Sequence, residues 1–265
     1  MTTSSTPRPK SALASIAVPP RWRAALRYLQ WADNIFKWRL SRAECPNCNG
    51  HLFLSLGGSP FMTRCLTCGT NATNLSLIPV IKSHAAHSNI DMVWEMSTYG
   101  AVLAFLKRTF HHVASSEFFS EVPSGEIVNG TLSQDVQNLS FGDESLDLIT
   151  SNQVFEHVPD DIRGYSECFR VLKKGGALIF TVPLYDHATT QQLAAIGPDG
   201  IKFFGEPEYH DSRTGGPESA LTFWRHSYHD ICERVSKVGF SARLADVTIA
   251  KSQQVPMKVI YAIKA

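Results

Sequence analysis

The sequence predicts an α/β fold for most of this 265-residue chain, with a mostly parallel sheet, helices on both faces, and a small cysteine-bearing module before it. Two observations carry this prediction. From residue 90 to residue 182, short apolar strand-like segments alternate with helix-like segments, which is the pattern of parallel strands joined by crossover helices. Ahead of that region, four cysteines stand in two pairs. A chain of this length can bury one full α/β core and still carry a small module.

The overall composition is that of an ordinary globular protein, with 43% hydrophobic and 18% charged residues. No apolar run approaches the roughly 20 residues that a membrane-spanning helix needs. Ser and Pro interrupt the apolar residues at the N-terminus, so we expect no secretory signal and a cytoplasmic location.

The N-terminal region is basic and has two parts. Residues 1–20 are rich in Ser, Thr and Pro and are predicted to form a mobile tail. Residues 21–44 place aromatic and aliphatic side chains at near-helical spacing, which predicts one or two amphipathic helices. Such a helical segment could pack on the main domain, line a homodimer contact or rest on a membrane surface, and packing is the favoured interpretation. Eight Lys or Arg residues against two acidic residues in 1–44 permit an anionic partner.

The paired cysteines predict a metal-binding ribbon over residues 45–75. They read C-x2-C, sixteen residues, then C-x2-C, and the residues between the pairs suit a β-hairpin that turns at Gly57-Gly58. Two such knuckles place four thiolates around one zinc ion, and four cysteines leave no coordination position open for catalysis. The predicted ligands of this structural zinc are Cys45, Cys48, Cys65 and Cys68.

The elements of the larger domain are predicted from their periodicity. Strands are expected at 90–96, 112–117, 127–131, 146–151 and 177–182, with helices at 100–109, near 153–157 and at 161–172. A Gly- and Pro-rich stretch at about 185–225 is longer than a plain connection and is typical of a lid or substrate loop. A helix in "SYHDICERVSKVG", with Gly239 as its C-cap, precedes two final strands at 241–249 and 257–264.

Three acidic residues follow three successive predicted strands. Glu95 closes the first strand, Glu117 the second, and Asp135 comes after the third. In open α/β sheets ligands bind beyond the carboxyl ends of the strands, where a carboxylate can accept hydrogen bonds from two ribose hydroxyls. Three acids would repel a pyrophosphate, which binds at glycine-rich helix N-termini. The pattern therefore favours an adenosine ligand without phosphates over a dinucleotide.

The segment "LSFGDESLDLITSNQVFEHVPDDIRGYSECFRVLKKGGALIFTVPL" resembles the class I S-adenosylmethionine-dependent methyltransferases, in particular the type 11 branch. The match is dense over residues 135–183, and weaker signals extend it to about 88–265. The resemblance implies a Rossmann-like seven-stranded sheet in which only the last strand is antiparallel. It also implies transfer of a methyl group from S-adenosyl-L-methionine.

The resemblance assigns roles to individual residues. Glu95 would contact the amino-acid end of the cofactor, Glu117 its ribose, and Asp135 with Val136 its adenine. Asn152 and Gln153 would line the methionine side, with His157 nearby. The whole predicted cofactor-binding set is Glu95, Met96, Ser97, Tyr99, Gly100, Glu117, Phe118, Asp135, Val136, Asn152 and Gln153.

The glycine loop departs from the family pattern. The family usually has E-x-G-x-G after the first strand, whereas this chain reads Glu95-Met96-Ser97-Thr98-Tyr99-Gly100. Side chains at these positions narrow the space for the methionine moiety. The hydroxyls and backbone N–H groups of the loop can still bind a carboxylate. We therefore expect an altered but working cofactor loop, and the alternative is a loop that has lost its function.

Candidate acceptor-side residues come from the long segment after the fifth strand. His210 is the first candidate for a base that acts on a hydroxyl, followed by His187 and then His157, and an ordinary structural histidine is the alternative for each. Tyr185, Tyr209 and Trp224 are the predicted substrate contacts. The "PEYH" and "TFW" stretches also resemble relatives encoded beside glycan or secondary-metabolite genes. A small molecule or sugar hydroxyl fits the aromatic, histidine-bearing loop and the mildly acidic body of the chain, so it is the favoured acceptor, which means O-methylation.

Two other functions remain open. An RNA methyltransferase could use the zinc ribbon and the basic N-terminal helix to bind phosphates, although Arg64 is the only basic residue between Cys45 and Cys68. A non-catalytic scaffold with a methyltransferase-like fold would explain the altered glycine loop.

Overall fold

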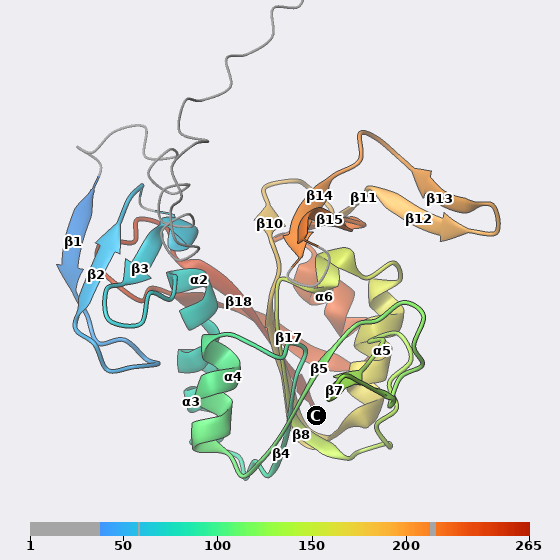
Figure 1. The fold of residues 1–265 in the computed structure, drawn as a ribbon, viewed down its shortest axis with the longest axis horizontal. Helices are drawn as coiled ribbons and strands as arrows, with labels where there is room; N and C mark the ends of the chain where they lie inside the picture. Colours follow the sequence, from blue (N-terminus) through green and yellow to red (C-terminus); the bar gives the residue numbers. More distant parts are fainter. Residues whose placement is uncertain (1–37, 58, 213–215) are drawn as a thin grey trace, which may run out of the picture.

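The computed structural model of the chain describes residues 38–57, 59–212 and 216–265. A large twisted sheet forms the centre of the molecule. Helices α3 (Leu77–Ala85) and α4 (Ala101–Thr109) cover one face, and α5 (Asp161–Val171) and α6 (Ile231–Ser236) cover the other (Figure 1). Each face buries its own apolar cluster against the sheet. This is the predicted α/β architecture with helices on both faces.

The central sheet has the strand order β17-β18-β9-β8-β4-β5-β7-β6. Pairing is parallel between β5 and β7, β4 and β5, β4 and β8, and β8 and β9, whereas β18 is antiparallel to both of its neighbours. The bounds are β4 Met92–Glu95, β5 His112–Glu117, β6 Ile127–Val128, β7 Thr131–Ser133, β8 Leu146–Asn152, β9 Leu172–Thr181, β17 Phe240–Val247 and β18 Met257–Lys264. Seven of these strands form the expected sheet with its last strand antiparallel, and β6 is an additional edge strand.

The single strand predicted at 127–131 is instead a small hairpin. β6 and β7 pair in antiparallel fashion, with Ile127 opposite Leu132. The two residues between them, Asn129 and Gly130, have φ angles of 49° and 80°. Two consecutive positive φ angles define the tight turn that matches the twist of a hairpin, and Asn-Gly is its preferred sequence. The Asn-Gly pair therefore ends the strand that the apolar pattern alone would continue.

The connection from α5 to β9 is shorter than predicted. The helix ends at Val171 and the strand begins at Leu172, five residues before the predicted start at 177. Near the beginning of β9 the backbone passes very close to its neighbours. A Cβ atom at Gly176 would lie 2.9 Å from the carbonyl oxygen of Lys173 and 3.0 Å from that of Asp147. Only glycine fits there, so this position allows β9 to pair with β8 through an irregular register.

The cysteine module is a three-stranded antiparallel ribbon followed by a short helix. β1 (Arg39–Arg42), β2 (Leu52–Ser55) and β3 (Thr63–Cys65) form its sheet, and α2 (Ala72–Leu75) leads into α3. The hairpin predicted between the two cysteine pairs is present as β2 and β3.

The helix predicted over residues 21–44 is wrong at its C-terminal end. Arg39–Arg42 is a strand whose residues pair with β2, from Arg39 opposite Ser55 to Arg42 opposite Leu52. Hydrogen bonding to an open ribbon edge outweighs the helical spacing of the sequence in this stretch. Most of the predicted helix and the whole of the predicted mobile tail lie outside the described residues.

The predicted substrate loop at about 185–225 is largely β-structure. β10 (Leu184–Tyr185), β11 (Gln191–Gln192) and β16 (Trp224–Ser227) form a small sheet in the order β10-β16-β11. Two hairpins project from it (Figure 1): β12 (Ala194–Gly197) with β13 (Gly200–Phe203), and β14 (Tyr209–Ser212) with β15 (Gly216–Leu221).

None of the helices in the described part of the chain is long and apolar enough to cross a membrane.

Candidate cofactor and acceptor site

A cavity of about 120 Å³ lies beyond the carboxyl ends of β4 and β5. Its wall combines apolar side chains with two of the predicted acids, Glu117 and Asp135. Six predicted site residues line it: Met96, Glu117, Phe118, Asp135, Val136 and His157. The other lining residues are Trp94, Ser116, Gln134, Gln137, Val154, Val158 and Pro159. The cavity is thus at the place in the sheet where the sequence predicted a nucleoside site.

Glu117 is held in position by the altered loop after β4. The backbone N–H and the hydroxyl of Thr98 both donate to Oε1 of Glu117, at 3.0 Å and 2.5 Å. Within the described residues, no hydrogen bond reaches the other oxygen, Oε2. The carboxylate is therefore fixed through one oxygen, and its second oxygen is left without a hydrogen bond from the described residues. Thr98, which was not predicted as a site residue, fixes this orientation.

The remaining loop residues form a compact turn outside the cavity lining. The hydroxyl of Ser97 lies 3.3 Å and 3.4 Å from the carbonyl oxygen and the N–H of Tyr99. The Tyr99 side chain is 48% exposed. Gly100 precedes α4 with a φ angle of 100°, a conformation that side-chain-bearing residues rarely adopt. Ser97, Tyr99 and Gly100 are therefore close to the site in sequence but do not line its cavity.

Glu95 is completely enclosed beneath this loop. The hydroxyl of Thr150, on the neighbouring strand β8, donates to one of its carboxylate oxygens. Burial raises the pKa of Glu95 to about 8, the Thr150 hydrogen bond lowers it, and the charge of Glu117 raises it further. A carboxyl group in this state becomes ionised readily only when a cationic partner is brought to it.

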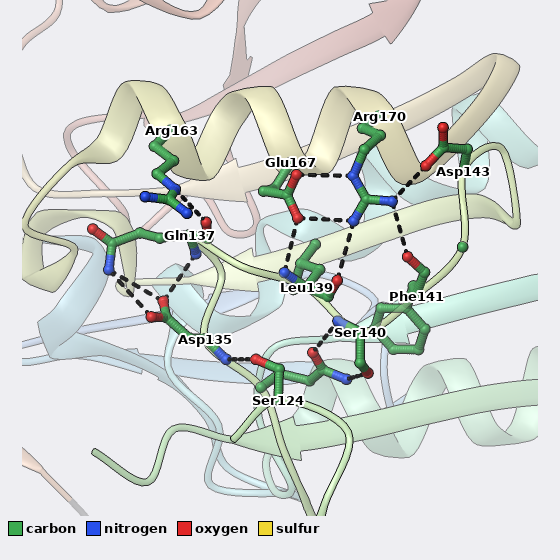
Figure 2. A network of polar contacts seen from close by, with 12 residues as sticks. Ser124, Asp135, Gln137, Leu139, Ser140, Phe141, Asp143, Arg163, Glu167 and Arg170 are labelled. Atoms are coloured by element: carbon green, nitrogen blue, oxygen red, sulfur yellow. Dashed lines mark hydrogen bonds and ion pairs between the residues drawn. The ribbon is translucent and has the colours of Figure 1, made fainter. Parts of the chain in front are cut away.

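Asp135 lies on a segment that α5 holds against the sheet (Figure 2). Its Oδ1 accepts from the N–H of Gln137 at 2.9 Å, and its own N–H donates to Ser124 at 2.8 Å. Arg163 on α5 donates to the carbonyl oxygen of Gln137 at 2.7 Å. Further along, Arg170 on α5 donates to the segment's backbone at Leu139 and Phe141 and pairs with Glu167 and Asp143. The helix thereby fixes the wall that carries Asp135 and Val136.

Asn152 and Gln153 are part of a hydrogen-bond chain and are not among the residues that line the cavity. Thr181 donates to Oδ1 of Asn152 at 2.6 Å and accepts from Nε2 of Gln153 at 3.2 Å. The Asn152 amide donates to Oδ1 of Asn74, on α2, at 2.8 Å. This series of hydrogen bonds links the end of β8 directly to α2, the helix that follows the cysteine ribbon.

On the acceptor side, the structure brings His157 and His210 together. His157 stands in the 3-10 helix η4 (Phe155–His157) and lines the cavity, whereas His210 comes from β14. Nδ1 of His210 lies 3.3 Å from Nε2 of His157. Burial lowers the pKa of His157, so this ring is neutral at physiological pH. Two predicted catalytic residues that are far apart in sequence therefore share one place at the edge of the cavity.

The other predicted acceptor residues are more scattered. The rings of Tyr185 and His187 stack with 5.8 Å between centroids, and Tyr209 is 45% exposed on the β14–β15 hairpin. Trp224 is buried, and its indole N–H donates to the carbonyl oxygen of Val158 at 2.8 Å. Trp224 thus anchors the small sheet to the η4 region, and none of these four residues lines the cavity.

The four cysteines of the ribbon form one cluster. Their Sγ atoms lie within 4.8 Å of one another, with 3.8 Å between Cys45 and Cys68 and 3.6 Å between Cys48 and Cys65. Sulfurs placed tetrahedrally at Zn–S distances near 2.3 Å are separated by about 3.8 Å. Burial raises the pKa of Cys45 to about 12. Burial also acts to raise the pKa of Cys68, but hydrogen bonds with the hydroxyl and backbone of Thr70 outweigh it and lower that pKa to about 7. The donor set and spacing fit a zinc ion.

Sequence reasoning missed two supporting residues, Glu156 and Arg170, and considered Thr98 only as a loop hydroxyl that could bind a carboxylate. Thr98 follows the serine that replaces a family glycine, and Glu156 precedes His157 in "FEHV". Arg170 lies in "FRVLKKGG", a part of the matching segment in which no site residue was predicted. A fully enclosed glutamate next to a histidine could not be recognised from spacing, because η4 is contacted by residues far along the chain, such as Phe223, whose N–H donates to the carbonyl oxygen of Glu156.

Comparison with known proteins agrees with this geometry. Residues 97–180 match the family model described as a methyltransferase domain. The malonyl-[acyl-carrier protein] O-methyltransferase 1 of Coxiella burnetii is 32% identical over 108 residues, covering 41% of this chain and 31% of that protein. A Mycolicibacterium smegmatis protein named "Probable S-adenosylmethionine-dependent methyltransferase" is 38% identical over 61 residues, covering 23% of this chain and 22% of that protein. The matched segments thus span about a third or less of these relatives.

Among solved structures, the amino pentose methyltransferase CalS10 from Micromonospora echinaspora aligns with a TM-score of 0.47 and 12% identity, over 73% of this chain and 92% of that one. An S-adenosylmethionine-dependent methyltransferase from Mesorhizobium loti aligns with a TM-score of 0.46 and 13% identity, over 71% of this chain and 97% of that one.

Residues 97–180 of this chain match a methyltransferase domain, and the sheet and cavity around them are those expected of a class I S-adenosylmethionine-dependent methyltransferase.

Proposed function

We propose that the protein transfers a methyl group from S-adenosyl-L-methionine to a hydroxyl oxygen of a small-molecule or sugar acceptor. The observation that carries this proposal is the cavity that joins a fixed Glu117 carboxylate to the His157–His210 pair. One end of it offers acceptors for a ribose, and the other offers imidazole nitrogens beside the place where an acceptor would enter.

The cavity suits the nucleoside part of the cofactor. Trp94, Val136 and Val158 supply apolar walls for a purine, and Oε2 of Glu117 is placed to accept from the ribose. We assign recognition of the exocyclic amine of the adenine to Asp135, because it lines the same cavity. Glu95, enclosed behind the loop, is the candidate partner for the ammonium group of the methionine moiety, because a cation there would offset the cost of its buried charge.

Methyl transfer requires alignment of the acceptor with the methyl group more than it requires acid–base catalysis. The cofactor supplies an activated methyl group, and the reaction is an in-line displacement at its carbon. The chain must exclude water and orient the acceptor oxygen, and it must help that oxygen to lose its proton. We assign this last task to His157, which lines the cavity, and to His210, which lies beside it on β14.

We also propose that Cys45, Cys48, Cys65 and Cys68 hold a structural zinc. The near-tetrahedral spacing of their sulfurs supports this assignment, and a four-thiolate site leaves no open position for substrate.

Calorimetric titration of the zinc-loaded protein with S-adenosylhomocysteine tests the proposed function. We expect micromolar binding that weakens by about tenfold or more in Glu117→Ala, because hydrogen bonds to a charged group contribute roughly 1.5–3 kcal/mol. Glu121→Ala removes a nearby exposed acid and should bind as the wild type does.

Absence of binding in all three proteins would overturn the proposal and favour a non-catalytic scaffold. RNA binding that falls steeply with added salt would instead favour an RNA acceptor.

A further inference from the structure

Three side chains with metal-ligating atoms converge where η4 meets β14. Glu156 and His157 are adjacent in η4, and His210 faces them from the hairpin. One ligating atom from each lies within 4.8 Å of the others. Nε2 of His157 is 3.3 Å from Nδ1 of His210 and 3.8 Å from Oε1 of Glu156. Ligands bonded at about 2.1 Å around a tetrahedral ion are separated by about 3.4 Å, so the spacing suits one cation.

The hydrogen bond on the far side of the His157 ring determines which ring nitrogen presents its lone pair to the cluster. Nδ1 lies 2.9 Å from the carbonyl oxygen of Leu221. Because a carbonyl can only accept, Nδ1 must carry the hydrogen and Nε2 must present its lone pair to the cluster. A histidine whose second nitrogen donates to a backbone carbonyl is the usual arrangement for a metal ligand.

His210 has a carboxylate on its far side, at a longer distance. Its Nε2 lies 3.4 Å from Oε1 of Glu208, a carboxylate that also pairs with Arg225 at 2.7 Å. An acceptor beside Nε2 favours the tautomer with its hydrogen there, which turns the lone pair of Nδ1 toward His157. Two imidazole lone pairs then face each other, and only a cation or a shared proton can lie between them.

Glu156 supplies the second, independent observation. Its side chain is fully buried, and neither of its carboxylate oxygens has a hydrogen-bond partner in the described part of the chain. A buried carboxyl group without a partner costs several kcal/mol if it is charged. A cation beside Oε1 would remove that cost.

We propose that Glu156, His157 and His210 bind a divalent transition-metal cation such as Zn²⁺, separate from the ion at the four cysteines. Two imidazoles and one carboxylate form a donor set of catalytic zinc sites, which keep a coordination position open. The side chains of His157 and His210 are 21% and 34% exposed, so the open position faces outward beside the cavity.

This inference rests on the proposed function for the role of the ion. An acceptor hydroxyl bound at the open position has a lowered pKa and loses its proton to water. Its oxygen then attacks the methyl carbon. The C–O bond forms as the C–S bond breaks, and the electron pair of the C–S bond stays on sulfur. In this mechanism the two histidines act as ligands and His210 need not serve as the base.

Cobalt titration of the protein, with its cysteine site already loaded with zinc, tests the site directly. Thiolate ligands give Co²⁺ an intense charge-transfer absorption that nitrogen and oxygen ligands do not give. We expect one equivalent of Co²⁺ with visible d–d bands and no thiolate charge transfer. The affinity should fall by about tenfold or more in His210→Gln and in Glu156→Gln, each of which removes one of the three ligands.

His229→Gln is the matched control. His229 is an exposed histidine that pairs with Asp186 outside the cluster, and its loss should leave Co²⁺ binding unchanged. His210 lies on a partly exposed hairpin, so His210→Gln keeps the test valid if the buried Glu156→Gln variant does not fold.

No Co²⁺ spectrum of the nitrogen–oxygen type, or equal affinity in His210→Gln and the wild type, would overturn the site in favour of a shared proton. Parallel titration with S-adenosylhomocysteine separates the two proposals. Cofactor binding without Co²⁺ binding overturns the cation site alone, and Co²⁺ binding without cofactor binding overturns the proposed function alone.

Discussion

Glu95 and Glu156 are two enclosed glutamates whose surroundings differ in one respect. Burial raises the pKa of each to about 8. Glu95 receives a hydrogen bond from Thr150, whereas no hydrogen bond to the Glu156 carboxylate is found within the described residues. Glu95 is therefore tolerated as part of the fold, with its hydrogen bond in place before any ligand arrives. Glu156 depends more strongly on a proton or a cation.

The pH dependence of stability should reveal the buried state of Glu95. Its folded pKa of about 8 exceeds the ordinary value of 4.5, so the folded protein binds this proton more tightly than the unfolded chain does. The contribution is fully present below about pH 4.5 and is lost as pH rises toward 8. Glu95→Gln removes this loss. Relative to wild type, its free energy of unfolding should therefore be higher at pH 8.5 than at pH 5, by an amount on the order of a few kcal/mol.

Urea unfolding at the two pH values measures this difference. Glu121→Gln, at an exposed acid, should show none of it. An identical effect of Glu95→Gln at both pH values would show that the carboxyl group is ionised in the folded protein and would contradict the prediction.

At the scale of single residues, the sequence predicted the positions of two acids better than the hydrogen bonds around them. Glu117 and Asp135 line the cavity because strand ends can be counted from alternating patterns. Ser97 and Tyr99 form a turn that does not line this cavity, and their contact with a cofactor stays a prediction. The loop conformation depends on Thr98 reaching Glu117, a contact between the loop after β4 and the end of β5 that no local pattern encodes.

At the scale of elements, α5 acts as a clamp on the segment that carries Asp135. Arg170 donates to two backbone carbonyls of that segment, at 3.0 Å and 3.1 Å, and forms a two-pronged pair with Glu167. Glu167 in turn accepts from the N–H of Leu139 at 2.9 Å. One ion pair on the helix thus satisfies three backbone groups of the neighbouring segment (Figure 2).

Replacing Arg170 should loosen this wall of the cavity. We expect Arg170→Met to lower the free energy of unfolding by about 2 kcal/mol, because it leaves Glu167 and two carbonyls without their donor. Affinity for S-adenosylhomocysteine should fall as well. Arg170→Lys should restore only part of both, since an ammonium group cannot reproduce the planar fork.

Chemical denaturation and calorimetry measure these two effects. Lys237→Met, which removes an exposed pair with Glu233, should change stability very little and serves as the control. Full cofactor affinity in Arg170→Met would show that the segment holds its conformation without the clamp.

Element positions were predictable wherever periodicity alone decides them. The strands β5, β8 and β18 and the helix α4 lie within about a residue of expectation. The errors fall where tertiary pairing or a turn takes over: Arg39–Arg42 became a ribbon edge, and Asn129-Gly130 divided a predicted strand. The β12–β13 and β14–β15 hairpins were also not predicted. Their strands pair mainly with each other and bury few side chains, so the sequence carries no clear alternation of apolar and polar residues there.

At the scale of the whole molecule, the cysteine ribbon packs against the α/β domain and shares a buried apolar cluster with it. Cys45, Phe53 and Cys65 belong to the same buried cluster as the apolar residues of α3, α4 and the sheet. Arg108 on α4 donates to the backbone and side chain of Asn47, inside the first knuckle, at 2.7 Å and 2.8 Å. The knuckle is thereby attached to α4, the helix that begins directly after the loop that follows β4.

Removal of zinc should therefore affect both parts of the molecule. Without the ion, the four thiols lose the bonds that close the ribbon, and zinc binding to such sites is worth many kcal/mol of folding free energy. Because the ribbon shares its buried cluster with the domain, we expect one unfolding transition whose midpoint falls by roughly 10 °C or more after chelation. The contact between Asn74 and Asn152 carries the disturbance to the end of β8. S-adenosylhomocysteine binding should weaken together with the midpoint and return when zinc is restored.

Differential scanning calorimetry of zinc-loaded, chelated and zinc-restored protein measures this coupling, and Cys45→Ser provides a version without chelator. Cys232→Ser changes a partly buried cysteine outside the cluster and should keep the wild-type midpoint within a few degrees. Two separate transitions, with cofactor binding intact after the first, would show that the ribbon folds independently of the domain. A single transition that shifts with zinc would mean that the ion stabilises the loop after β4 indirectly, through α4 and the buried cluster they share.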